Sequence, residues 1–306
     1  PDGYCGKPAG AGTDVFAMDT GNGGSPFPTF DSGFPVDFAL YTMTAATHTK
    51  ATAARLTGAT YLATESTNDE TSFADFVFDS NVGWDKDAAS TGHLSWMWKR
   101  HSGFDVVTYS GLNISGSQIS HNLGKTPEMI WVKCRNDTYD WAVYHKGLNG
   151  GTNPAQYYIN INSSSAEAAA SNRWNDTAPN STHVTLGNSA HTNGGGNRTY
   201  TMMLFASVDG ISKVGYYDGS GSSRTITTGF QPRFIIFKCT TDAESWFTFD
   251  TTRGWASGDD QYLQLNSNAA QSAHDVGAPT STGFTIPDGH GAFNQSGRKY
   301  IYYAHA

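Results

Sequence analysis

The sequence has few charged residues, few cysteines and no long apolar run. Of its 306 residues only 15% are charged, whereas 13% are aromatic and 34 are glycine. A disordered chain would have few aromatic residues and a high net charge, and a helical protein would be rich in Ala, Leu, Glu and Lys instead of Gly, Asn, Ser and Thr. These shortages exclude disorder and a mainly helical fold, and they predict an all-β protein.

The sequence also lacks membrane segments and clusters of basic residues. No apolar stretch approaches the roughly 18 residues that a spanning helix needs, and no signal-type segment opens the sequence. The formal net charge is −8, and no run of Lys or Arg is longer than two residues, as in Lys99-Arg100. Binding to a phosphate backbone needs a clustered basic face, so we expect neither membrane insertion nor a nucleic-acid partner.

One segment of the sequence occurs twice. LGKTPEMIWVKC at residues 123–134 returns as GFQPRFIIFKC at residues 229–239, with a shared spacing of about 105 residues. The residue pairs that share this spacing are Pro127 and Pro232, Lys133 and Lys238, Cys134 and Cys239, and Trp141 and Trp246. A more divergent first copy is predicted from VFAMD at 15–19, which resembles VGYYD at 214–218, and from residues 93–100, which take the place of the closing strand.

A spacing this long fits whole small domains instead of solenoid units. We predict three tandem β-sandwich repeats, jelly-roll or concanavalin A-like, of about 100 residues each. Their boundaries are a linker or lead-in at 1–12 and repeats at 13–102, 103–209 and 210–306. Short junctions, such as Ser102-Gly103, predict a stiff row of domains. The apolar run in EMIWVK at 128–133 predicts a strand buried on both faces, and residues 163–172 predict one or two helical turns.

Cysteine usage predicts free thiols. Cys134 and Cys239 occupy equivalent positions of separate repeats, farther apart than the Cα separation of about 7 Å that a disulfide tolerates. We expect both to be half-buried strand residues, and Cys5 has no assigned role. Free thiols also suit folding in a reducing compartment.

Catalytic and metal-binding patterns were sought and not found. The five glutamates, Glu65, Glu70, Glu128, Glu167 and Glu244, form no strand motif that pairs two carboxylates, and no nucleophile elbow, HExxH, P-loop or dinucleotide motif is present. The ten histidines are scattered, and we expect solvated loop residues instead of metal ligands. Acidic pairs at Asp85 and Asp87 and at Asp259 and Asp260 do not follow a calcium loop and are expected to be exposed turn residues. We predict no enzyme activity, no cofactor and no metal site.

Tryptophan gives the candidate binding residues. Trp141 and Trp246 repeat at one strand position and are expected in the core, whereas Trp84, Trp174 and Trp255 lie in loops rich in Gly, Asp and Asn. An indole face can stack on a sugar ring while amides and carboxylates bind its hydroxyl groups. The candidate carbohydrate-binding residues are Trp84, Trp174, Asn175, Asp176 and Trp255. The alternative, to which we give more weight, is that each tryptophan closes its own sandwich or packs against the next domain.

Several longer motifs resemble a known family. GFDVVTYSGLN, ISHNLGKTPEMIWVK, DWAVYHKGLNGGTNP, WNDTAPNSTHVTLG and the ending YIYYAHA resemble structural proteins of marine tailed bacteriophages, including cyanophages, which are described as tail fibre, fibre-like or concanavalin A-like lectin domain proteins. The likeness covers residues 103–306 well and 15–100 more loosely. It implies a virion protein of repeated β-sandwich domains, made in the reducing host cytoplasm and placed on the particle surface. It carries over no catalytic or metal-binding residue.

These observations give three functional hypotheses. The first is a tail fibre or fibre-like appendage that binds host-surface polysaccharide, forms a homo-oligomer, preferably a trimer, and contacts other virion proteins. The second is a capsid or tail decoration protein whose loops bind neighbouring virion proteins. The third is a polysaccharide-degrading enzyme.

Overall fold

The computed structural model describes residues 10–86, 89–287 and 289–306, and it confirms that the protein is nearly all-β. Cys5, Asp87 and most of the predicted lead-in at 1–12 lie outside the described residues. In the described ranges the only α-helix, α1 (Ser171–Trp174), has 4 residues. No helix there is long and apolar enough to cross a membrane.

Three large antiparallel sheets have the same strand order. The first sheet consists of β1 (Phe16–Thr20), β9 (His93–Trp98), β3 (Phe38–Met43), β4 (Ala51–Ala54), β5 (Thr60–Ala63) and β6 (Thr71–Ser72), in that order. The second consists of β10 (Phe104–Ser110), β17 (Thr199–Phe205), β12 (Met129–Cys134), β13 (Ala142–His145), β14 (Tyr157–Asn160) and β15 (Ala168–Ala169). The third consists of β18 (Ser212–Asp218), β26 (Lys299–His305), β20 (Phe234–Cys239), β21 (Phe247–Asp250), β22 (Asp260–Gln264) and β23 (Ser272–His274). In each large sheet, the strand that comes last in the sequence (β9, β17 or β26) lies between two strands that come earlier.

A smaller sheet accompanies each large one. These are β2 (Phe30–Asp31), β8 (Gly83–Lys86) and β7 (Phe76–Val77); β11 (Ser117–Ser120) and β16 (His183–Leu186); and β19 (Arg224–Thr227), β25 (Gly283–Ile286) and β24 (Pro279–Thr280). Short 3-10 turns complete the fold: η1 (Gly12–Asp14), η2 (Leu148–Gly151), η3 (Pro154–Gln156) and η4 (Thr251–Arg253). Side chains of each small sheet share an apolar core with one face of its large sheet, a packing consistent with a β-sandwich.

The predicted helix at 163–172 is wrong. Ala168 and Ala169 instead form strand β15, and helix α1 begins only at Ser171. The N–H of Glu167 donates to the carbonyl of Thr240, which follows strand β20 of the third sheet. Helix propensity is a weak preference that such tertiary hydrogen bonds override.

The alignment of VFAMD with VGYYD is also displaced. Val214 pairs with Tyr303, and the residue in the same place of the first sheet is Met18, which pairs with Trp96. Val15 precedes strand β1.

Strands β3, β12 and β20 are buried on both faces, as the apolar run predicts for β12. In β12, Met129 and Trp131 point to one apolar cluster, whereas Ile130 and Val132 point to another. Strands β20 and β3 alternate in the same way. Phe234 and Phe38 point to the first cluster, whereas the next residues, Ile235 and Ala39, point to other clusters. One face packs on the small sheet, and the other faces the centre of the molecule.

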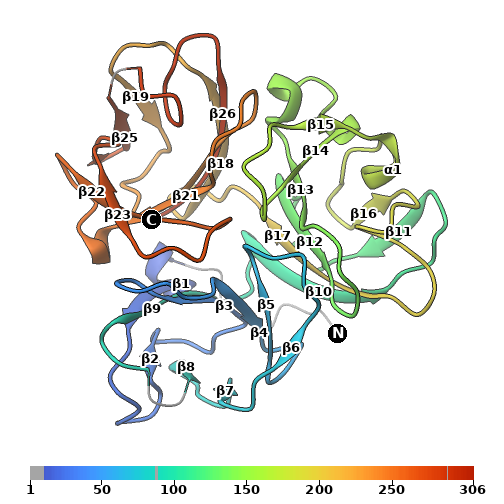
Figure 1. The fold of residues 1–306 in the computed structure, drawn as a ribbon, viewed down its shortest axis with the longest axis horizontal. Helices are drawn as coiled ribbons and strands as arrows, with labels where there is room; N and C mark the ends of the chain where they lie inside the picture. The colour runs from blue at the N-terminus through green and yellow to red at the C-terminus, as the bar shows by residue number, and fades with distance from the viewer. Residues whose placement is uncertain (1–9, 87–88, 288) are drawn as a thin grey trace.

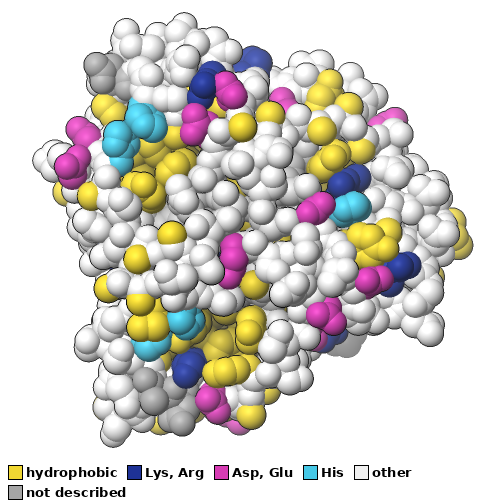
Figure 2. Space-filling model, in the orientation of Figure 1, with side chains coloured by type: hydrophobic (Ala, Val, Ile, Leu, Met, Phe, Trp, Pro, Cys, Tyr) yellow, Lys and Arg dark blue, Asp and Glu magenta, His cyan; other side chains and the backbone are white. Residues whose placement is uncertain are grey.

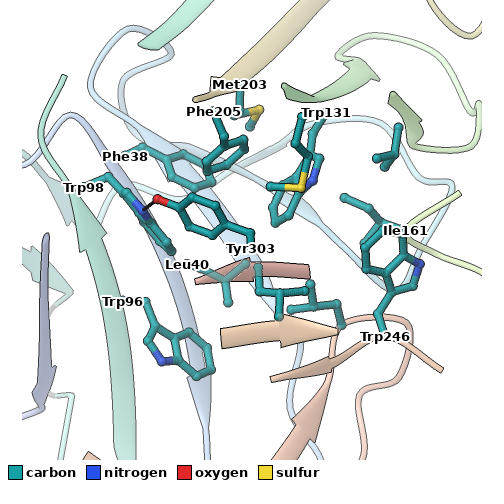
Figure 3. Close-up of a cluster of buried hydrophobic side chains, with 14 of the residues drawn as sticks. Phe38, Leu40, Trp96, Trp98, Trp131, Ile161, Met203, Phe205, Trp246 and Tyr303 are labelled. Carbon is teal, nitrogen blue, oxygen red and sulfur yellow. Dashed lines mark hydrogen bonds between the residues drawn. The ribbon is translucent and has the colours of Figure 1, made fainter. Parts of the chain in front are cut away.

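The central cluster is shared by all three large sheets. Figure 3 shows Trp96 and Trp98 of the first sheet, Trp131 and Phe205 of the second, and Tyr303 of the third packed together there. The indole N–H of Trp98 donates to the hydroxyl of Tyr303 at 3.3 Å. The three large sheets therefore surround one core, with their small sheets at the periphery (Figure 1). The expectation of a stiff row of domains is wrong, because a row would leave these central faces in water.

Hydrogen bonds close this arrangement into a ring. Three backbone N–H groups donate in cyclic order from first to second, second to third and third to first sheet: Glu70 to Arg135 at 2.7 Å, Glu167 to Thr240 at 2.8 Å, and Gln271 to Thr44 at 2.7 Å. Each donor directly precedes the last strand in its sheet's order, β6, β15 or β23. Each acceptor directly follows the strand that is buried on both faces, β3, β12 or β20. The ring closes without a covalent link between the first and third sheets.

Tryptophan fills two of the three joints between sheets. The indole N–H of Trp141 donates to the carbonyl of Ala63, and that of Trp246 to the carbonyl of Asn160, each at 2.8 Å. Both tryptophans are fully buried, which confirms their predicted core role. The first sheet has Lys50 at this position, and its Nζ donates to the carbonyl of Ala269 at 3.0 Å. Burial lowers the pKa of Lys50 to about 8.

Buried histidines lie between the sheets, contrary to the expectation of solvated loop residues. His101, His145 and His305 are all buried. His145 accepts from the N–H of Gly147 through Nδ1 at 2.9 Å, and its Nε2 lies 3.3 Å from the carbonyl of Tyr302 in the third sheet. Burial lowers the pKa of His101 to about 4 and that of His145 to about 3, and it lowers the pKa of His305 well below the usual value.

The free thiols are confirmed. Cys134 and Cys239 are both free, but they are fully buried instead of half-buried as expected, one in each of two peripheral cores. Burial raises the pKa of the Cys134 thiol, which makes it a poor nucleophile.

Loss of a joint tryptophan should weaken the whole ring. We expect Trp246→Ala to lower the free energy of unfolding by about 3–5 kcal/mol, because it removes a large side chain from the shared core. Guanidinium denaturation followed by circular dichroism measures this change. Leu56→Ala is the control, since Leu56 is 48% exposed. Equal effects of the two substitutions would contradict a shared central core.

Acid should destabilise the fold through the buried histidines. Their pKa values are lower in the folded than in the unfolded protein, so the unfolded state binds more protons as the pH falls below about 6.5. Stability contributed by neutral His145 is therefore complete above that pH and decreases by roughly 1.4 kcal/mol per pH unit toward the folded pKa of about 3. Denaturation midpoints between pH 7 and pH 4 should fall more steeply for the wild type than for His145→Gln. Parallel curves would show that His145 does not titrate in this way.

Candidate ligand-binding groove

The three loop tryptophans proposed for sugar stacking are buried. Trp84 is 0% exposed, Trp174 is 1% and Trp255 is 2%. Each belongs to a different peripheral core, so the structure does not bring them together. The carbohydrate-binding prediction for these side chains is wrong in this structure, because a sugar cannot reach an indole face that protein atoms cover.

Trp84 illustrates why no face is free. Phe30 stacks on it at a ring-centroid distance of 5.5 Å, and Phe78 stacks on it at 5.3 Å. Its indole N–H donates to Ser95 Oγ at 2.9 Å. Both the apolar and the polar requirements of the side chain are met inside the protein, in agreement with the alternative that each tryptophan closes its own sandwich.

Asn175 and Asp176 have a backbone role. Both have left-handed φ angles, 52° and 48°, and Asn175 ends helix α1. Asn and Asp tolerate this conformation better than other non-glycine residues. Asp176 is exposed and Asn175 half-buried, but the neighbouring Trp174 offers no stacking surface.

An open groove lies instead at the edge of the third sheet. Its volume is about 460 Å³. The edge strand β18 forms its floor, strand β19 of the small sheet forms one side, and Lys146 of the second sheet lies at the other. Because β18 is an edge strand, side chains from both of its faces reach the groove, Lys213 from one and Tyr216 from the other.

Tyr216 is the exposed aromatic residue of this groove. It is 48% exposed, and it rests on a glycine loop of the second sheet. A Cβ added to Gly147 would lie 2.5 Å from Tyr216 Cβ, and one added to Gly151 would lie 2.5 Å from its hydroxyl oxygen. Glycine at both positions is therefore what allows the ring to lie across the junction between the second and third sheets.

A second tyrosine lies over the floor. Tyr302 pairs with Gly215 across the sheet, and a Cβ at Gly215 would lie 2.3 Å from its hydroxyl oxygen. Among the described residues, no hydrogen-bond partner of this hydroxyl is found, although the ring itself is buried. Burial raises the pKa of Tyr302, so the hydroxyl stays protonated and can donate to a ligand.

Three cations line the groove, at Lys146, Lys213 and Arg224. Lys146 Nζ pairs with Glu128 Oε1 at 2.6 Å, and Arg224 Nη1 donates to the carbonyl of Asp218 at 2.8 Å. Thr225 and Thr227 add exposed hydroxyl groups. The groove thus combines an aromatic ring, hydroxyl groups and positive charge.

The matching edges of the other two sheets lack this chemistry. Sheet pairing places Asp105 and Thr108 where the third sheet has Lys213 and Tyr216, and Asp105 is buried with its carboxylate bound to backbone N–H groups. The first sheet has Ala17 and Thr20 there. The groove is therefore not a general consequence of the fold.

A second groove, of about 450 Å³, contains His274, Asp275 and His290. The two histidine rings lie 4.2 Å apart, and burial lowers the pKa of His290. Figure 2 shows two groups of histidine atoms beside hydrophobic side chains on the left of the drawn face, and a separate histidine on the right. Within the ranges that the structure describes, no group of three or more His, Cys, Asp or Glu is placed to hold a metal ion.

A family model matches residues 91–306, from just before strand β9 to the end of the chain. The chain belongs to the family described as domain of unknown function DUF7483. The match includes the complete second and third sheets and therefore every residue of the β18–β19 groove. No curated protein and no solved structure matches the chain.

The sequence alone does not identify the residues of the groove, because a strand pattern does not show which of its faces is exposed. Residues 211–217 are readable as a strand, and its two adjacent tyrosines must point to opposite faces. That pattern could have identified one exposed tyrosine. It could not reveal which one, nor that Lys146 lies beside it.

Buried tryptophan and exposed tyrosine should respond differently to truncation. We expect Trp84→Ala to lower the free energy of unfolding by about 3–5 kcal/mol, because it opens a cavity in a peripheral core. Tyr216→Ala should cost about 1 kcal/mol or less, because half of its surface is already in water. Thermal and chemical denaturation of both variants compares the two values, and a Trp84 variant as stable as the wild type would contradict its burial.

Proposed function

We propose that this protein is a structural component of a tailed-bacteriophage virion, a tail fibre or fibre-like appendage on the particle surface, and that it binds host-surface glycan. Support for the virion role comes from the resemblance of residues 103–306 to marine phage structural proteins. Support for glycan binding comes from the groove, where an exposed tyrosine, hydroxyl groups and cations meet in one open site.

We also propose that the three large sheets, with their small sheets, are three tandem concanavalin A-like β-sandwich repeats at 13–102, 103–209 and 210–306. Equal strand order and equal pairing support this division. Cys134 pairs with Tyr200 in the second sheet, and Cys239 pairs with Tyr300 in the third.

The observation that carries the glycan proposal is the position of Tyr216. Sugar rings present a face of C–H groups that stacks on an aromatic ring, while their hydroxyl groups need donors and acceptors around the edge. The Tyr302 hydroxyl and the two threonines of β19 supply these partners. An open groove of this kind binds one sugar weakly, and several chains in one particle would add strength by multivalency.

The closed ring of three large sheets limits how a homotrimer of chains can form. Three sheets already share a core within one chain, so a trimer of chains would have to form through surfaces outside that core. The β18–β19 groove lies at the edge of the third sheet, beside Lys146 of the second sheet, and a trimer of this kind would have to leave that edge open.

Glycan binding should depend on Tyr216. We expect Tyr216→Ala to weaken binding to printed host-envelope glycans by about tenfold, equivalent to the roughly 1.4 kcal/mol of one stacking contact. Leu56→Ala is the control, since Leu56 has the same exposure of 48% and lies far from the groove in sequence, in the turn between β4 and β5. Equal binding by the two variants would remove the groove from the proposal, and release of reducing ends from the glycans would favour an enzyme instead.

A further inference from the structure

We infer that the β18–β19 groove selects anionic glycans, those with uronate, sialate or sulfate groups, and this inference rests on the proposed function. The observation behind it is the charge of the groove. Of the described residues that line it, three are cationic and none is Asp or Glu. The whole chain has a net charge of −8, so this local excess of positive charge runs against its composition.

Two of the three cations are not neutralised by a carboxylate. Arg224 donates to a backbone carbonyl of Asp218, and the carboxylate of that residue pairs with Lys299 at 2.7 Å. Within the described chain, Lys213 Nζ has neither an ion pair nor a hydrogen bond, and its side chain is half-buried. Both cations therefore retain hydrogen-bonding capacity toward a ligand.

Lys146 differs, because Glu128 holds it in place. Glu128 also accepts from the N–H of Ser207, which fixes the pair at the end of the groove. These contacts lower the pKa of Glu128 in spite of its burial, so the pair stays ionised. Lys146 thus marks one end of the site with a fixed donor.

A neutral sugar would cover Lys213 and Arg224 without pairing them. Removing water from an unpaired cation is costly, whereas a carboxylate or sulfate supplies a charge-assisted hydrogen bond. The groove would therefore favour an acidic sugar over its neutral counterpart. Nucleic acid is a poorer fit, since phosphate-backbone binding needs an extended basic face and the groove holds only three cations.

The test pairs acidic glycans with neutral counterparts of the same backbone. Oligogalacturonate is compared with its carboxyl-reduced form, and sulfated galactan with its desulfated form, by binding of the full chain at low and high salt. We expect the acidic member of at least one pair to bind about tenfold or more tightly than the neutral member, and salt to reduce this difference.

Charge reversal locates the effect. Lys213→Glu should abolish the preference for the acidic member, whereas Lys99→Glu, the same charge change at a half-buried lysine outside the groove, should keep it. Thermal unfolding confirms that both variants are folded. Equal binding of acidic and neutral members by the wild type would overturn the inference and leave glycan binding intact. Absence of binding to every glycan, on this set and on the envelope-glycan array, would overturn both.

Discussion

Two-sided burial of the large sheets is the constraint on which this structure depends. A sheet that is apolar on one face can stop at a single sandwich, but β3, β12 and β20 are apolar on both faces. Each small sheet covers one face only. The second face must be removed from water by another apolar surface, and the closest such surfaces belong to the other two large sheets. A closed ring of three satisfies all of them at once.

The joints of the ring are chemically unequal. Trp141 and Trp246 fill two of them with aromatic surface and one hydrogen bond each, whereas buried Lys50 fills the third. The third joint is also the one with no covalent connection, between the beginning and the end of the described chain (Figure 1). A buried amine with lowered pKa stabilises less than an indole, since its charged form has lost water. This joint therefore gains less from Lys50 than each of the other two gains from its tryptophan.

The proposed binding site lies on a surface that is not buried when the three sheets pack together. The central faces and the peripheral cores are filled by large aromatic side chains, among them all three of the loop tryptophans first considered for binding. What stays open is a sheet edge, where side chains from both faces of β18 meet those of β19 and of the second sheet. Glycine at 147, 151 and 215 lets tyrosine rings lie close to the backbone there. The chemistry of the groove thus comes from a junction between sheets.

The sequence by itself determined the class of fold and the position of its repeated central strand. The apolar run at 128–133 located β12 to within a residue, and its second copy at 229–239 contains β20. The sequence also identified two free cysteines and the two core tryptophans that share a strand position.

Only the tertiary structure decided what each buried face touches. An apolar run indicates that a strand is covered on both faces but does not indicate which surface covers it. A row of domains and a ring of sheets were therefore equally compatible with the sequence. Loop tryptophans among Gly, Asp and Asn look exposed in the sequence, yet all three are buried, and Phe30 and Phe78 stack on Trp84. The groove unites Lys146, Tyr216 and Arg224, which only the packing of the second sheet against the third brings together. Burial and site geometry depend on contacts between residues that are far apart in the sequence. The periodicity of apolar residues describes only residues that are close together in the sequence.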